Sequence, residues 1–206
     1  MAHKQLKDIA DWAISNQRLG GPHFKPVRMT WIKPSFAWVC YRSGYASKHN
    51  QTRILKIKLS HESVARLLSQ CKCSHGGGGS FGRVQWDPER DLLAGDLKEP
   101  RKMLRTRAIQ IGFKGHLSEE YVDSILSVED VTELARKLGK AHRFDHTAKS
   151  KSNEAVAGLL SELPDEKPYV PKCSNEVLAA LGMAPGETAT AVYGLGKGKA
   201  VHETRR

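Results

Sequence analysis

The sequence predicts an α+β fold: a single compact domain with a small mixed sheet flanked by helices, followed by a flexible C-terminal tail. Apolar residues recur at helical spacing in several segments, whereas one segment alternates apolar and basic residues as a half-buried strand does. The chain has 206 residues, of which 39% are hydrophobic, and this suffices for one buried core.

An amphipathic helix is expected at the N-terminus. Its apolar positions are Leu6, Ile9, Ala10, Ala13 and Ile14. The run Gly20-Gly21-Pro22 ends this pattern, because glycine and proline disfavour the continuation of a helix. Residues 27–32 then predict a short strand.

The middle of the chain continues with a strand and a capped helix. Residues 53–59 alternate apolar and basic side chains, which predicts a strand with Lys56 and Lys58 on its solvent-facing side. Ser60 is a suitable N-cap for the helix that follows. The apolar stripe of this helix contains Val64, Leu67 and Leu68. The glycine run at residues 76–79 predicts a flexible loop.

Two more strands and two more helices are expected before residue 140. The strands are predicted over residues 83–86 and 108–113, with a basic stretch between them. Ser118 is expected to open a helix, because carboxylates follow it in the first turn, where they favour the positive end of the helix dipole. A further helix over residues 131–138 is expected to end at Gly139.

These patterns divide the chain into three parts. Residues 1–140 form the core domain, and residues 141–183 form a polar linker and a helical extension. Residues 184–206 are predicted to be a disordered tail, because they contain few large apolar side chains.

The charge of the chain is concentrated in its first third. The formal net charge is +11, and residues 1–60 contain 11 Lys and Arg against 2 Asp and Glu. Such an excess attracts polyanions, so a phosphate-bearing ligand or a nucleic acid is the expected partner. A basic surface that serves only solubility is the alternative. The sequence defines no oligomeric state.

The compartment follows from what the sequence lacks. There is no run of roughly 18 apolar residues and no apolar signal-peptide core, so we expect a cytoplasmic or otherwise intracellular protein without a membrane partner. The four cysteines are expected to be free thiols. Cys71, Cys73 and His75 are closer together than zinc ligands usually are and lack a fourth member, so no metal site is predicted.

One segment interleaves aromatic and basic residues and is the candidate ligand-binding site. Aromatic rings can stack on a base, and guanidinium groups can donate paired hydrogen bonds to phosphate. The candidate ligand-binding residues are Arg28, Trp31, Lys33, Ser35, Trp38, Tyr41, Arg42, Lys48 and Gln51. The charged ends of Arg28, Lys33, Arg42 and Lys48 are expected to share one solvent-accessible region. Alternatively, the aromatic residues belong to the core.

The same segment resembles an uncharacterised family, domain of unknown function 4291. The similar motifs are Arg-x-Thr-Trp-Ile-Lys-Pro-Ser-Phe-x-Trp at residues 28–38, Tyr-Arg-Ser-Gly at 41–44, Lys48, Gln51, Arg-Val-Gln-Trp-Asp-Pro-Glu-Arg at 83–90, Ile-Gln-Ile-Gly at 109–112 and Asp-Val-Thr at 130–132. The resemblance covers roughly residues 5–140 and implies no settled activity. Two features depart from the family pattern: its first strand is absent here, and the segment before residue 83 is shortened.

The order of elements in that family is distantly similar to ADP-ribosyltransferases. This similarity implies NAD as a cofactor, Arg28 as the residue that anchors it, and Glu89, beside Asp87, as the catalytic acid. The alternative for residues 87–90 is a turn that closes a strand, because Asp and Pro are common turn residues.

Two functions of different classes therefore follow from the sequence. The first is an enzyme, or the degenerate descendant of one, that acts on a nucleotide or nucleic-acid phosphate. The second is a noncatalytic, basic nucleic-acid-binding module. The enzyme predicts a pocket where Arg28, Arg42 and Glu89 converge, whereas the module predicts a wide basic face.

Overall fold

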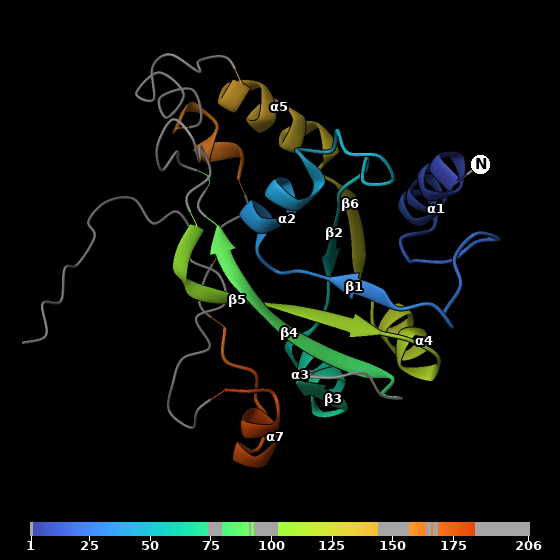
Figure 1. The fold of residues 1–206 in the computed structure, drawn as a ribbon. Helices are drawn as coiled ribbons and strands as arrows, with labels where there is room; N and C mark the ends of the chain where they lie inside the picture. The colour runs from blue at the N-terminus through green and yellow to red at the C-terminus, as the bar shows by residue number, and fades with distance from the viewer. Residues whose placement is uncertain are drawn as a thin grey trace, which may run out of the picture.

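The computed structural model describes residues 2–73, 80–90, 92, 103–143, 157–163, 166 and 169–183 (Figure 1). Three expectations lie outside these residues: the glycine loop, the greater part of the polar linker, and the C-terminal tail. The described part contains both helices and a small sheet in which parallel and antiparallel pairs occur together. The α+β fold is therefore confirmed.

The helices are α1 (Ala2–Asn16), α2 (Phe36–Ser43), α3 (His61–Ser69), α4 (His116–Asp123), α5 (Thr132–Arg143) and α7 (Asn175–Ala180), with a short 3-10 helix at Leu160–Glu162. The strands are β1 (Thr30–Ile32), β2 (Leu55–Lys58), β3 (Cys71–Cys73), β4 (Gly82–Arg90), β5 (Met103–Phe113) and β6 (Ser127–Asp130). Four of the strands form one sheet in the order β1-β5-β4-β3, in which only the β3–β4 pair is parallel. The antiparallel pair β2–β6 is separate.

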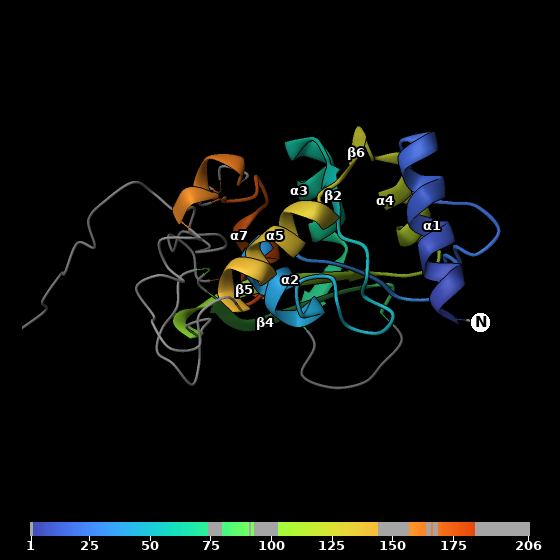
Figure 2. The same cartoon turned by 90° about the horizontal axis from the view of Figure 1, so that it is seen from above.

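The main core lies on one face of the four-stranded sheet. Val84 of β4 and Ile109, Ile111 and Phe113 of β5 are buried there, in one cluster with residues of α1, α3 and α4. Figure 2 shows α3 and α4 on the same side of β4 and β5, with α1 beside them at the right edge. Helix α2 lies toward the other side, and its buried residues join α5 in a second cluster around Cys40.

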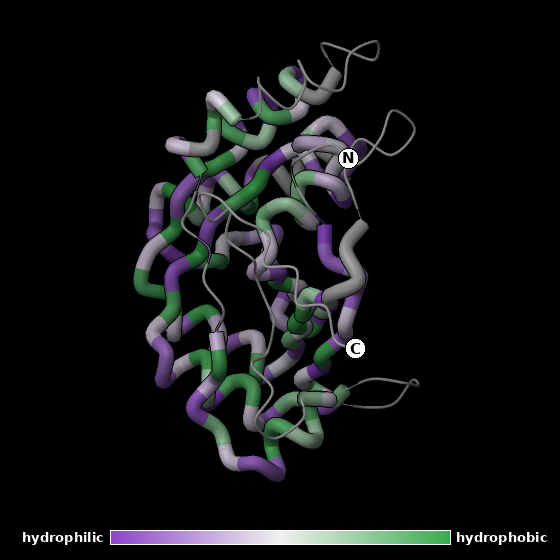
Figure 3. The backbone as a smooth tube through the Cα atoms, turned by 90° about the vertical axis from the view of Figure 1, so that its left-hand side faces the viewer, coloured by the Kyte–Doolittle hydropathy of each residue, from purple (hydrophilic) through white to green (hydrophobic). Residues whose placement is uncertain are grey.

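Hydrophobic and hydrophilic residues alternate along the elements, as Figure 3 shows. Strand β2 follows the expected pattern, since Leu55 and Ile57 are half-buried while Lys56 and Lys58 are exposed. Within the described residues, no helix has both the length and the apolar character needed to cross a membrane.

The predicted cap of α3 is confirmed. The Ser60 hydroxyl accepts a hydrogen bond of 3.0 Å from the backbone N–H of Ser63. Replacing Ser60 with alanine leaves that N–H without its side-chain acceptor, so we expect the free energy of unfolding to fall by about 1 kcal/mol. Urea unfolding measures this change. Ser69→Ala, at the C-terminal end of the same helix, is the control, and an equal loss in both variants would contradict the capping role.

Residues 87–90 are part of a strand, so the predicted turn is wrong. Strand β4 continues to Arg90, with an irregular register between Pro88 and Arg90. Proline lacks the N–H that a central strand donates, but β3 pairs only with residues 82–84 of β4. The described part of β4 near Pro88 therefore pairs on one side alone, and a bulge and an edge position both tolerate proline.

Several boundaries also differ from the prediction, among them the start of β5, which lies at Met103 instead of residue 108. Helix α4 begins at His116, with Gly115 at the N-cap, and Ser118 is fully buried in its first turn. Gly115 has φ +58°, and a Cβ there would come within 2.8 Å of Phe81, so glycine fits this turn and serine would not. Helix α5 passes through Gly139 to Arg143, because the fully buried Leu138 anchors that turn. Strand β1 begins at Thr30, whereas residues 27–28 lie in a turn.

Helix α2 was not expected from the aromatic segment. Its local signals are nevertheless clear. The Ser35 hydroxyl accepts a hydrogen bond from the N–H of Trp38, and Gly44 ends the helix in the left-handed conformation. The buried residues Phe36, Ala37, Cys40 and Ser43 recur at helical spacing.

Candidate functional site

Lys33 follows β1 and occupies the centre of a charged cluster. Its ammonium group donates hydrogen bonds to Asp87 Oδ2 at 2.7 Å and to the carbonyl oxygen of Ala108 at 2.9 Å. The register of the sheet pairs Asp87 with Ala108, so the two acceptors lie side by side on β4 and β5. The Lys33 side chain is only 4% exposed. Burial lowers the pKa of Lys33, while Asp87 and then Glu89 act in the opposite direction.

Helix α2 places an aromatic ring over the same ammonium group. The Nζ of Lys33 lies 4.2 Å from the centre of the Trp38 ring, which is a cation–π contact. Trp38 is half-buried. Ser35, another predicted ligand-binding residue, is 1% exposed and serves as the cap of α2.

Two further carboxyl groups complete the cluster. Glu89 is 2% exposed. Glu166 Oε1 accepts a hydrogen bond of 2.8 Å from the backbone N–H of Phe36, at the N-terminus of α2. Burial raises the pKa of Glu166 to about 7, and the negative charge of Glu89 adds to this shift. We refer to Lys33, Trp38, Asp87, Glu89 and Glu166 as the Lys33 cluster.

The residues of this cluster are suited to proton transfer next to the hydrogen-bonded ammonium group of Lys33. A carboxyl group with a pKa of about 7 can give or take a proton at neutral pH. A nearby ammonium group can stabilise negative charge on a ligand, and the N-terminus of α2 favours anions for the same electrostatic reason.

Four other predicted residues, Tyr41, Arg42, Lys48 and Gln51, lie in or just after α2 and do not enter the cluster. The guanidinium group of Arg90 lies 3.9 Å from the centre of the Tyr41 ring. Lys48 donates a hydrogen bond of 3.4 Å to the carbonyl oxygen of Arg42. Both Arg42 and Lys48 are exposed. The backbone N–H of Gln51, which is half-buried, bonds to the carbonyl oxygen of Lys48.

The expected surface shared by four cations does not form around Lys33, because its ammonium group is buried. Arg28 precedes β1 by two residues, whereas Lys33 follows β1 directly, so they lie at opposite ends of this strand. Trp31 lies between them and is 39% exposed. A cavity of about 150 Å³ lies elsewhere, between α1 and the chain before β2, and its lining residues are Ile9, Ala10, Asn50, Thr52, Arg53 and Leu55.

Two residues at or near the site, Arg90 and Glu166, were not among the residues predicted from the sequence. Arg90 belongs to the motif at residues 83–90 and could have been included from its position beside Glu89. Glu166 carries no local signal, since it is one of several charged residues between two prolines. Its role depends on a contact with Phe36, 130 residues earlier in the chain.

Comparison with known proteins identifies one family. The profile of the family described as domain of unknown function (DUF4291) matches residues 3–169. The match includes the whole Lys33 cluster and extends beyond residue 140, where the resemblance noted from the sequence ended. No curated protein and no solved structure matches the chain.

Proposed function

This chain belongs to the DUF4291 family, and from the geometry of its Lys33 cluster we propose that it is an enzyme acting on a phosphate-bearing substrate, a nucleotide or a nucleic acid, or a descendant of such an enzyme. The observation that carries the proposal is the burial of Lys33 and Glu89 beside the half-buried carboxyl groups of Asp87 and Glu166.

Such an arrangement lowers the stability of the fold if it has only a structural role. Removing charged groups from water costs several kcal/mol per ion, and packed hydrophobic residues of similar size often stabilise a fold equally well. Ionisable groups with perturbed pKa values concentrate at functional sites for this reason. The structural alternative is that the cluster fixes α2 against β4.

The N-terminus of α2 supports an anionic ligand. The Phe36 N–H already binds a carboxyl group, that of Glu166, and phosphate groups favour the same position on a helix. A ligand phosphate at this position would replace Glu166. Lys33 and the ring of Trp38 would then lie beside it.

ADP-ribosyl transfer from NAD is the reaction that we propose to test first. In it the bond between ribose and nicotinamide breaks, nicotinamide leaves, and a nucleophile of the acceptor forms the new bond to the ribose, while the phosphate groups serve only for binding. Glu89 would be the acidic residue, assisted by Asp87. Arg28 fits the role of NAD anchor poorly, because it lies at the opposite end of β1 from the cluster. Arg90, which neighbours Glu89 and stacks on Tyr41, is better placed for that role.

A nucleotide screen tests the proposal. We expect NAD or another nucleotide at about 100 times its dissociation constant to stabilise the protein by about 2.7 kcal/mol, which raises the melting temperature by several degrees. Glu89→Gln should keep this binding and lose about 100-fold or more in turnover, because it removes a group for proton transfer. Turnover is followed by chromatography of NAD and its products.

The control variant is Glu129→Gln, on the exposed part of β6. Equal turnover in the Glu89→Gln variant and the wild type would remove Glu89 from the chemistry. If no nucleotide raises the melting temperature, the noncatalytic nucleic-acid-binding module becomes the better explanation. The exposure of Trp31 favours that second candidate.

A further inference from the structure

We propose that the face of the four-stranded sheet opposite the main core binds single-stranded RNA, with Trp31, Lys72, Arg83, Gln85 and Gln110 as its contact residues. We call this the polar sheet face. The inference rests on the proposed function and specifies its substrate, because the same face ends at the Lys33 cluster. Of these residues, only Trp31 was predicted from the sequence to bind a ligand.

The strand register aligns four positions in one row across the whole sheet. Trp31 of β1 pairs with Gly112 of β5, Gly112 pairs with Arg83 of β4, and Arg83 pairs with Lys72 of β3. Directly opposed residues point to the same face of a sheet. The row therefore presents an aromatic ring at one edge and two cations toward the other.

Gly112 makes room for the Trp31 ring against this row. A Cβ at Gly112 would come within 2.8 Å of the Trp31 ring and of the Met29 sulfur atom. The absence of a side chain thus allows the indole to rest on the β5 backbone, while 39% of Trp31 stays exposed. An exposed ring held by the sheet can stack on an unpaired base.

The next two rows lead from the ring to the cluster. Gln85 pairs with Gln110, and both are half-buried. Their amide groups donate and accept hydrogen bonds, as base edges and ribose 2′-hydroxyl groups require. In the following row Asp87 pairs with Ala108, and Lys33 bonds to both. A strand bound along this face would therefore bring its backbone to the Lys33 cluster.

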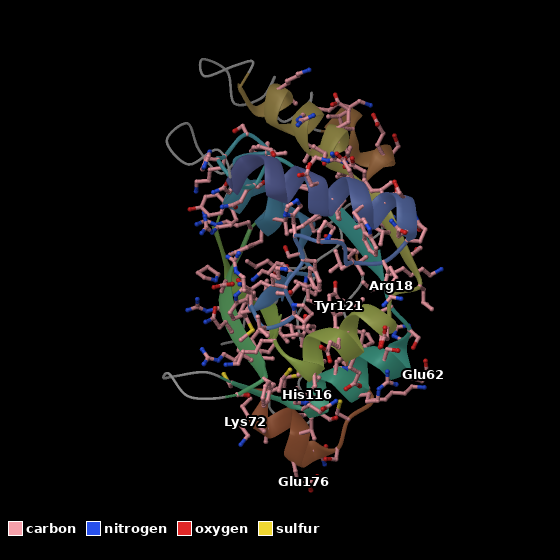
Figure 4. The ribbon with its side chains drawn as sticks, turned by 90° about the vertical axis from the view of Figure 1, so that its right-hand side faces the viewer. Arg18, Glu62, Lys72, His116, Tyr121 and Glu176 are labelled. Carbon is pink, nitrogen blue, oxygen red and sulfur yellow. The ribbon has the colours of Figure 1, made fainter. Side chains whose placement is uncertain are left out.

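The opposite face of the same strands is occupied by the core, through Cys71, Val84, Ile109 and Ile111. Figures 1 and 2 show β4 and β5 in front of α3 and α4, with α2 at one end of the polar sheet face. In Figure 4, Lys72 lies on the opposite side of the molecule from Arg18 and Glu62. Helix α2 contacts β4 at that end.

The chemistry of this face favours RNA in single-stranded form. Its charged side chains outside the Lys33 cluster are cations, which complement phosphate groups. Stacking on Trp31 requires a base that is free of its partner, and a duplex offers none along its length. The amide groups of Gln85 and Gln110 favour RNA over DNA, because the ribose 2′-hydroxyl group offers them an additional hydrogen-bond donor and acceptor.

The test measures fluorescence anisotropy of a labelled 12-nucleotide single-stranded RNA of mixed sequence over a series of salt concentrations. Trp31→Ala should weaken binding by about 5- to 150-fold with little change in salt dependence, whereas Trp31→Phe should keep most of the affinity. Lys72→Ala and Arg83→Ala should each reduce the log–log salt slope by about 0.7. Lys58→Ala, an exposed strand lysine of the other sheet, is the matched control and should bind as the wild type does.

Melting curves of every variant identify losses due to unfolding, and Trp31→Phe distinguishes stacking from packing. The inference is wrong if folded Trp31→Ala and Lys72→Ala variants bind as the wild type does, or if single-stranded DNA or duplex RNA of the same sequence binds equally well. These outcomes leave the nucleotide screen with Glu89→Gln intact. Conversely, RNA bound on this face without any turnover would contradict the proposed enzyme and support the inference.

Discussion

Replacing Lys33 with methionine is expected to lower the free energy of unfolding by about 3–5 kcal/mol. The substitution removes a buried ammonium group that is hydrogen-bonded to Asp87 and to the backbone of Ala108. It leaves the half-buried carboxylate of Asp87 without its cation, and breaking a buried ion pair by removing one partner is among the most destabilising changes in a folded protein. Urea unfolding at pH 7, followed by circular dichroism, measures the loss.

The matched control is Lys56→Met on β2. Lys56 also bonds to a carboxylate, that of Glu129 at 2.9 Å, but both side chains are more than half exposed. A surface ion pair of this kind contributes at most about 1 kcal/mol. If the two methionine variants lose the same small amount, Lys33 is a surface cation in solution and the Lys33 cluster does not exist.

Glu166→Gln is expected to stabilise the protein by up to about 3 kcal/mol at pH 8 and to change its stability little at pH 4. Burial raises the pKa of the Glu166 carboxyl to about 7 from an ordinary value of 4.5. Below pH 4.5 this carboxyl group is protonated in the folded and the unfolded chain. As the pH rises through 4.5, the unfolded chain ionises first, so the folded state loses stability until about pH 7, where the loss is complete.

Glutamine keeps the oxygen that accepts the Phe36 N–H but carries no charge, so the variant avoids this loss. Urea unfolding of both proteins at pH 4, 5, 6, 7 and 8 gives the difference in stability as a function of pH. Glu119→Gln, an exposed residue in the first turn of α4, is the control and should show no such trend. A difference between Glu166→Gln and the wild type that is constant from pH 4 to pH 8 would contradict a buried, neutral Glu166.

Segments whose structure depends mainly on residues close to them in the sequence were predicted well. The alternation of Leu55, Lys56, Ile57 and Lys58 is that of the observed strand β2, and Ser60 caps α3 as its type suggests. The errors occurred where a distant contact outweighs a local preference. Pro88 favours a turn, yet pairing with β5 extends the strand beyond it, and the burial of Leu138 carries α5 through Gly139.

The candidate site was likewise predicted only in part. Its residue types could be identified from the sequence, since Lys33, Trp38, Asp87 and Glu89 all belong to recognisable motifs. Their environment could not: Lys33 was expected at the surface, and Glu166 was not considered at all. Lys33 meets Asp87 across 54 residues of chain, and Phe36 meets Glu166 across 130.

Periodicity and caps thus predicted most of the helices and the half-buried strand, the charge count indicated the basic character of the chain, and the motifs identified the family. Tertiary structure decided the burial of Lys33 and the position of Glu166 near Glu89. It also decided the alignment of Trp31 with Arg83 and Lys72, which depends on which strands pair and in which register. A local pattern fixes the direction of a side chain relative to its own backbone. Whether that direction leads to water or to a charged partner depends on the packing of segments that are far apart in the chain.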